Sequence, residues 1–256
     1  MSAVARGMAL KRGATAATVE GVHALAAVLA TAAAVVLVAV QPFSGRRRYH
    51  RLLETLPGDP GARLRHYRRG IVGEWSAVGL LVVIGVLAGR SPASVGLTGG
   101  THPGAATAEV LEVAVVLAAS AVVFRAPALR STIQRQARGF VALLPRTVDE
   151  RTAFALLAVT AGVCEELIFR GFGIAYVRWL WPGATHFWLI AITSAAFGLA
   201  HLYQGVRGVL LTGLVGAVLA SLVLATGSLL PAMVIHALID LRVLALPPLN
   251  SSDASV

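Results

Sequence analysis

The fold class is decided by residues 208–241, GVLLTGLVGAVLASLVLATGSLLPAMVIHALIDL, in which Asp240 is the only Asp, Glu, Lys or Arg. Two further stretches, 21–45 and 179–206, contain none of these residue types. A helix needs about 20 apolar residues to cross the hydrocarbon core of a bilayer. Residues 208–241 are therefore long enough for two short spans, and the sequence predicts a polytopic helical membrane protein.

The composition of the whole chain agrees with this prediction. Of its 256 residues, 57% are hydrophobic and 13% are charged, whereas soluble domains have about 25% charged residues. The mean hydropathy is +0.76. So few polar residues cannot cover a water-facing exterior, which excludes an ordinary cytosolic enzyme and a disordered chain. The one cysteine, Cys164, excludes an internal disulfide framework and a thiolate-rich zinc site.

We expect an all-α transmembrane helix bundle that forms one integral-membrane domain over residues 1–256. The predicted spans are 22–42, 70–89, 108–127, 155–180, 184–204, 208–226 and 229–246. Residues 1–20 and 247–256 are expected to be flexible tails. The first apolar segment could instead be a signal peptide, because basic residues precede it, but its apolar run is longer than the usual about 7–15 residues.

The distribution of arginine predicts the orientation in the membrane. Residues 46–69 contain eight Arg and residues 125–151 contain six, whereas the segment 90–107 contains only Arg90. By the positive-inside rule, both basic segments are expected on the cytoplasmic side. Anionic lipid headgroups are then sufficient partners for the net charge of +10, and no nucleic-acid partner is expected.

Ionisable side chains inside the predicted spans are the strongest functional signal, because they are costly in lipid. They are Glu165, Glu166, Arg170, Arg178, His201, His236 and Asp240. Three other carboxylates lie near the starts of spans, where we expect them to reach water: Glu74, Glu109 and Glu112.

The spacing of these residues predicts two different roles for the adjacent glutamates. Glu166 and Arg170 are i,i+4 neighbours in the favourable order, so we expect an ion pair. Glu165 points about 100° away around the helix and has no partner there. An unpaired carboxylate suits a general base, although a water-lined structural acid is an alternative.

A hairpin is expected to bring the acidic and histidine residues to one depth. The midpoint between Glu165 and His201 falls at Gly183, in the turn signal Trp181-Pro182-Gly183. His201 is about four residues from the basic end of its span, so we expect the site in the cytoplasmic half. A capping box at Thr147 predicts a helix start there. A helix from Thr147 to Leu180 would be about 50 Å long, so it should bend near Gly162 or lie partly in the interface.

Three ordered motifs resemble one protein family. They are Glu165-Glu166-x-x-x-Arg170, Phe197-x-x-x-His201 and His236-x-x-x-Asp240, with Leu144-Pro145-x-Thr147-x-x-Glu150 before them. This pattern, over residues 144–246, resembles the CPBP family, which comprises the CAAX proteases and bacteriocin-processing enzymes. The resemblance implies an all-helical fold of about eight helices and a glutamate-dependent intramembrane endopeptidase.

The resemblance also implies roles for single residues. Glu165 corresponds to the base that activates water, His201 to its partner in holding that water, and His236 with residue 240 to the oxyanion stabilisers. Glu166, Arg170 and Phe197 are supporting residues. The family often has Asn at the last position, whereas this chain has Asp240, which can donate a hydrogen bond only when protonated.

No cofactor and no metal are expected. Glu and His could bind Zn²⁺, but the chain lacks a His-Glu-x-x-His motif. Cys164 is disfavoured as a nucleophile because no His neighbours it in the sequence.

The predicted function is hydrolysis of a peptide bond in a membrane-associated peptide or protein. Two alternatives are a non-proteolytic binding or immunity protein of the same fold and a proton-coupled transporter. The transporter ranks last because the sequence shows no internal repeat. The preference for Arg over Lys suggests a bacterial cell membrane, where a prenylated substrate is not the default expectation.

Overall fold

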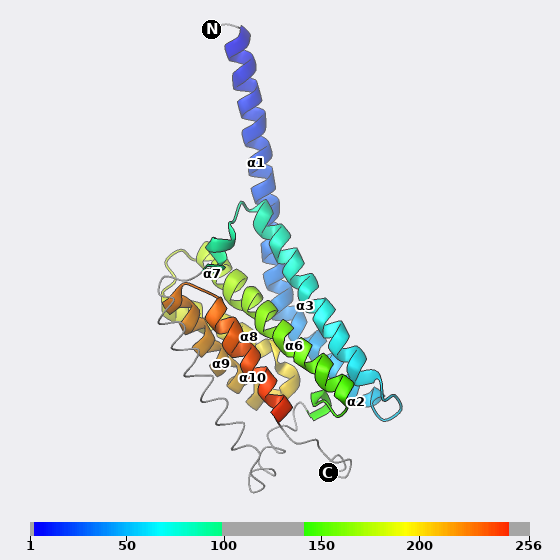
Figure 1. Cartoon of the computed structure of the whole chain (residues 1–256). Helices are drawn as coiled ribbons and strands as arrows, with labels where there is room; N and C mark the ends of the chain where they lie inside the picture. The colour runs from blue at the N-terminus through cyan, green and yellow to red at the C-terminus, as the bar shows by residue number, and fades with distance from the viewer. Residues whose placement is uncertain (1–2, 99–140, 246–256) are drawn as a thin grey trace.

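The computed structural model describes residues 3–98 and 141–245, and every regular element in these ranges is helical (Figure 1). The N-terminal elements are α1 (Ala3–Val35), the π-helical η1 (Val36–Val40), α2 (Gln41–Thr55), α3 (Ala62–Leu87) and the 3₁₀ turn η2 (Pro92–Val95). The C-terminal elements are η3 (Val141–Leu143), α6 (Val148–Glu166), the π-helical η4 (Leu167–Phe172), α7 (Gly173–Leu180), α8 (His186–Ala200), η5 (Leu202–Gln204), α9 (Gly205–Thr226), α10 (Leu230–Leu241) and η6 (Arg242–Ala245). The predicted all-α fold is confirmed.

Four continuous helices in the described ranges are long and apolar enough to cross a membrane. They are Thr18–Thr55, Ala62–Leu87, Val148–Leu180 and Leu202–Thr226. The predicted spans 184–204 and 229–246 are shorter in the structure. The first corresponds to α8, which ends at Ala200 before the turn η5. The second corresponds to α10, which has 12 residues. The predicted span 108–127 lies outside the described residues.

Helical structure covers residues 3–20 of the predicted N-terminal tail. Helix α1 begins at Ala3, in a segment that is rich in alanine and has no proline, and this composition favours a helix. Figure 1 shows this part of α1 extending beyond the other helices. The other predicted tail, 247–256, lies outside the described residues.

The long helix Val148–Leu180 carries the first motif. It begins with the predicted capping box, in which Thr147 and Glu150 each accept a hydrogen bond from the backbone N–H of the other. The α-helix is not interrupted at Gly162, where a bend is expected. Helix α6 continues to Glu166, and the π-helical segment η4 begins at Leu167. A Cβ atom at Gly162 would lie 2.7 Å from the backbone nitrogen of Ala237, so glycine allows α6 and α10 to approach closely.

Helix α9 packs closely against α8 at a glycine of α8. A Cβ atom at Gly198 of α8 would lie 2.6 Å from the carbonyl oxygen of Val209. Helix α6 packs against both α3 and α10. Helix α10 also packs against α9, so the three motif-bearing helices α6, α8 and α10 belong to one bundle (Figure 1).

The two ends of the bundle differ in charge. At one end, Arg63 of α3 forms a buried ion pair with Glu150 of α6 at 2.9 Å, and Arg151 donates to the carbonyl of Leu244 after α10. At the other end, Leu229 donates its N–H to the carbonyl of Gly96 at 2.9 Å. The arginine-rich α2 lies at the first end (Figure 1). The described parts of both basic segments therefore share one end of the bundle.

Candidate active site

The three motifs meet around the carboxylate of Glu165. Its Oε2 lies 3.9 Å from Nε2 of His201 and 3.8 Å from Nε2 of His236. The predicted hairpin is present, because α7 ends at Leu180 and α8 begins at His186. The fold thus brings together one acid and two imidazoles that are far apart in the sequence.

Glu166 holds this cluster together from a fully buried position. Its Oε1 lies 2.8 Å from NH1 of Arg170 and 2.8 Å from Nδ1 of His236. The side chains of Glu166 and Arg170 are both 0% exposed. The predicted ion pair is confirmed, and the same carboxylate oxygen also accepts a hydrogen bond from His236.

Phe197 links the second motif to the other two. The guanidinium of Arg170 lies over its ring at 4.2 Å, and the ring of His236 meets it edge-on with 5.6 Å between centroids. The backbone carbonyl of Phe197 lies 2.9 Å from Nδ1 of His201. The buried Phe197 therefore contacts Arg170, His236 and His201 at the same time.

Gly216 of α9 completes the pocket for the arginine. Its carbonyl accepts a hydrogen bond from NH2 of Arg170 at 3.0 Å. A Cβ atom at Gly216 would lie 2.9 Å from the ring of Phe197 and 3.1 Å from NH2 of Arg170. A side chain here would clash with the ring of Phe197 and crowd the guanidinium of Arg170, so the position favours glycine.

The hydrogen bonds at Nδ1 fix how both histidines present their other nitrogen. In each ring Nδ1 faces an acceptor, the carbonyl of Phe197 or the carboxylate of Glu166, so Nδ1 carries a proton. Both Nε2 atoms face Oε2 of Glu165, which has no hydrogen-bond partner among the described residues. Distances of 3.8–3.9 Å exceed a hydrogen bond and are suited to a bridging water.

Asp240 lies at the edge of the cluster. Its Oδ2 is 3.9 Å from Nε2 of His236, and its side chain is 37% exposed. It thus faces the same nitrogen as Glu165, not the nitrogen that Glu166 binds. The side chains of Glu165 and His201 are 19% and 14% exposed, so exposure increases from Glu166 through Glu165 to Asp240.

One residue that the motifs do not include also faces this site. Glu74 of α3 interacts electrostatically with Glu165, Asp240 and His236. Its Oε2 is buried, although the residue as a whole is half-buried. The signal in the sequence was its position inside an apolar span. Glu109 and Glu112 lie outside the described residues.

Two other candidates do not form a site of their own. Cys164 is buried in an apolar cluster with Val78, Ile168 and Phe169, which disfavours a reactive thiol. Among the described residues, no group of three His, Cys, Asp or Glu side chains is arranged to hold a metal ion.

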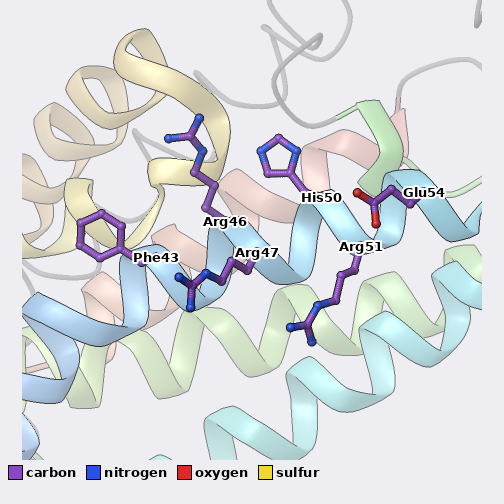
Figure 2. A pocket seen from close by; sticks show the side chains of 6 residues that line it. All are labelled: Phe43, Arg46, Arg47, His50, Arg51 and Glu54. Atoms are coloured by element: carbon purple, nitrogen blue, oxygen red, sulfur yellow. The ribbon is translucent and has the colours of Figure 1, made fainter.

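A separate pocket lies on the surface of α2. It is lined by Phe43, Arg46, Arg47, His50, Arg51 and Glu54. In Figure 2, Arg46 and His50 point to one side of the helix, and Arg47 and Arg51 point to the other. None of these residues belongs to the cluster around Glu165.

Comparison with known proteins supports the family resemblance. Residues 148–242 match a family described as type II CAAX prenyl endopeptidase, Rce1-like. Comparison with curated proteins and with solved structures found no match. The matched segment contains all three motifs and every residue of the cluster except Glu74. Over residues 148–242, the chain therefore matches the CAAX protease family that its motifs predict.

Proposed function

We propose that the protein is an intramembrane endopeptidase that uses Glu165 to activate water. The observation that carries this proposal is the position of the Glu165 carboxylate, which faces the Nε2 atoms of two histidines from different helices. The match of residues 148–242 to CAAX endopeptidases supports the same reaction.

The geometry provides for water activation as follows. A water between Glu165 and His201 donates one hydrogen bond to the carboxylate and the other to Nε2 of His201, which can accept it because the ring proton is on Nδ1. The lone pairs of the water are then free to attack a carbonyl carbon. Glu165 takes the proton as the C–O bond forms and passes it to the leaving nitrogen as the C–N bond breaks.

His236 is suited to stabilise the oxyanion. As an imidazolium, His236 donates one hydrogen bond from Nδ1 to Glu166 and a second from Nε2 to the substrate oxygen. Glu165, Glu166 and Asp240 supply negative charge around this ring. Glu166 also holds the ring in place, while Arg170 neutralises Glu166 from the buried side.

The substrate is a peptide or protein anchored in or on the membrane, for which bacteriocin precursors are one candidate class. We infer that the site opens toward the end of the bundle that carries the arginines, because the ring of Tyr203, two residues after His201, lies 5.5 Å from that of Tyr49 in α2. We assign this end to the cytoplasm by the positive-inside rule. Asp240, the most exposed of the four proposed active-site residues, is then placed at the opening toward the cytoplasm.

Anionic phospholipids are the proposed lipid partners. Arg46, Arg47 and Arg51 project from α2, which continues directly from an apolar helix that is hardly buried within the protein. None of the three forms an ion pair with a described residue. Phosphate headgroups at the membrane surface would supply the missing negative charge.

The activity is tested by comparing membranes that contain the wild-type protein or Glu165→Gln. New peptide termini should appear in the membrane proteome with the wild type and be absent with the variant, which keeps the shape of the side chain. Glu20→Gln, at an exposed glutamate of α1, is the matched control and should cleave like the wild type. Equal cleavage by purified wild type and Glu165→Gln would reject the mechanism, and no cleavage by either would favour the non-proteolytic alternative.

A further inference from the structure

Glu74 is a carboxylate outside the three motifs that lies beside the candidate active site. Val78, one turn later on the same face of α3, packs against Cys164 and Phe169 of the long motif-bearing helix. This packing brings the face of α3 that carries Glu74 to the part of α6 that carries Glu165. The electrostatic interactions of Glu74 with Glu165, Asp240 and His236 agree with this position.

The two carboxylates differ in their surroundings. Glu165 has an imidazole nitrogen of His201 and one of His236 within 4 Å. Glu74 forms no ion pair in the described part of the chain, and its buried Oε2 has no hydrogen-bond partner there. Oε2 of Glu165 lacks a hydrogen-bond partner as well.

Two negative charges close together inside an apolar span repel strongly, because the surroundings screen them poorly. One proton bound to the pair removes this repulsion. It is held better by Glu74, which forms no ion pair in the described part of the chain, since two imidazole nitrogens within 4 Å stabilise a negative charge on Glu165. By this argument the proton resides on Glu74, and Glu165 stays ionised as a base requires.

We propose that Glu74 is a positioning residue for Glu165, which it orients by donating a hydrogen bond from its protonated carboxyl group to the unpaired Oε2. This inference rests on the proposed function of Glu165. A carboxylate oxygen accepts two hydrogen bonds, so Oε2 can accept one from Glu74 and one from the attacking water. The two bonds together fix the direction in which the base faces the water.

The proton of Glu74 is not consumed in the reaction. The proton taken from water goes to Glu165 and then to the leaving nitrogen, while Glu74 keeps its own. The groups that face Glu74 are Cys164 and Glu165 of α6 and His236 and Asp240 of α10. Ionisation of Glu74 at high pH would remove the donor and add a negative charge beside Glu165, which lowers activity.

The activity test compares two substitutions at the same position. Glu74→Gln keeps a neutral donor of the same shape, so kcat should stay near the wild-type value and activity should extend to higher pH. Glu74→Leu removes the donor, and kcat should fall about 10- to 100-fold with KM unchanged, as expected for loss of a hydrogen bond to a charged group. Glu20→Gln, at an exposed glutamate of α1, is the control for a neutralised carboxylate elsewhere and should keep the wild-type pH profile.

A Glu74→Gln variant as inactive as Glu74→Leu would overturn the proposal, and so would a fully active Glu74→Leu. Infrared spectroscopy of the protein in membranes gives a second measurement that needs no activity. The wild type near neutral pH should show the C=O stretching band of a protonated carboxyl group, and Glu74→Gln should lack it. Absence of the band would reject a protonated Glu74 even in an active enzyme. A wild type that shows the band but cleaves no substrate would reject the peptidase function instead.

Discussion

Glu166 binds Nδ1 of His236 at 2.8 Å with the same carboxylate oxygen that binds Arg170. The sequence predicts the pair with Arg170, because the two residues are one helical turn apart. The bond to His236 joins α6 to α10 across 70 residues of chain. Glu166 therefore has two functions, one in stability and one in holding an imidazole whose other nitrogen faces Glu165.

These two functions can be separated by substitution. Glu166→Ala should lower both thermal stability and activity, because breaking a buried ion pair costs about 3–5 kcal/mol. The double variant Glu166→Leu/Arg170→Leu removes both charges and should recover much of the stability, since apolar residues of similar volume often replace a buried pair without loss. It should not recover activity, because His236 still lacks its acceptor. Thermal melting and cleavage rates of the three proteins measure this, and recovery of activity in the double variant would show that the bond to His236 has no role.

The sequence predicts most of the site because its residues follow local rules. Helical spacing gives the Glu166–Arg170 pair, and the turn at Trp181-Pro182-Gly183 gives the shared depth of Glu165 and His201. Long-range contacts do not follow such rules. Neither the proximity of Glu74 to Glu165 nor the fit of Arg170 between Phe197 and Gly216 can be inferred from spacing, because each depends on how separate helices pack.

The helix boundaries show the same limit. Apolar composition predicts where spans lie, but α8 and α10 are shorter than their apolar segments suggest. Helix α8 ends at Ala200 because the chain turns at His201 into η5. Gly162 suggests a bend from sequence alone, whereas in the structure it permits the contact with Ala237.

The mechanism predicts that activity does not depend on a metal ion. Activity should survive exhaustive chelation, and the purified protein should lack stoichiometric zinc. In the described ranges the carboxylate and imidazole groups are not arranged as a three-ligand metal site, and a water held by Glu165 and His201 needs no metal for activation. One zinc ion per chain, with activity lost on chelation and regained on addition of zinc, would contradict this mechanism and indicate metal-assisted hydrolysis.

The arginines of α2 should determine binding of anionic phospholipid. Each basic residue near a membrane surface contributes about 1 kcal/mol, so changing Arg46, Arg47 and Arg51 to Gln should weaken binding about 100-fold. Native mass spectrometry of the detergent-purified protein with an anionic and with a zwitterionic phospholipid measures this. The zwitterionic lipid is the control and should bind both proteins alike. Equal binding of the anionic lipid to wild type and variant would exclude α2 as the lipid site.

Asp240 is the residue at which this chain departs from the family pattern, and its ionisation state decides its role. Its Oδ2 faces Nε2 of His236 at 3.9 Å, whereas Glu166 already holds Nδ1. Asp240 is therefore not needed to orient the ring, and its remaining role is as a counter-charge that favours the imidazolium form. We expect an ionised Asp240.

Asp240→Asn distinguishes the two ionisation states through the pH–rate profile. Without the counter-charge, His236 loses its second proton at a lower pH, so the rate should fall and the alkaline limb of the profile should move to lower pH. If Asp240 were instead a protonated donor to the oxyanion, the amide of Asn would replace it, and activity would persist to higher pH. Asp149→Asn, at an exposed position in the first turn of α6, is the matched control and should leave the profile unchanged. A profile of Asp240→Asn identical to that of the wild type would exclude both roles, because either one couples the charge at position 240 to the proton on His236.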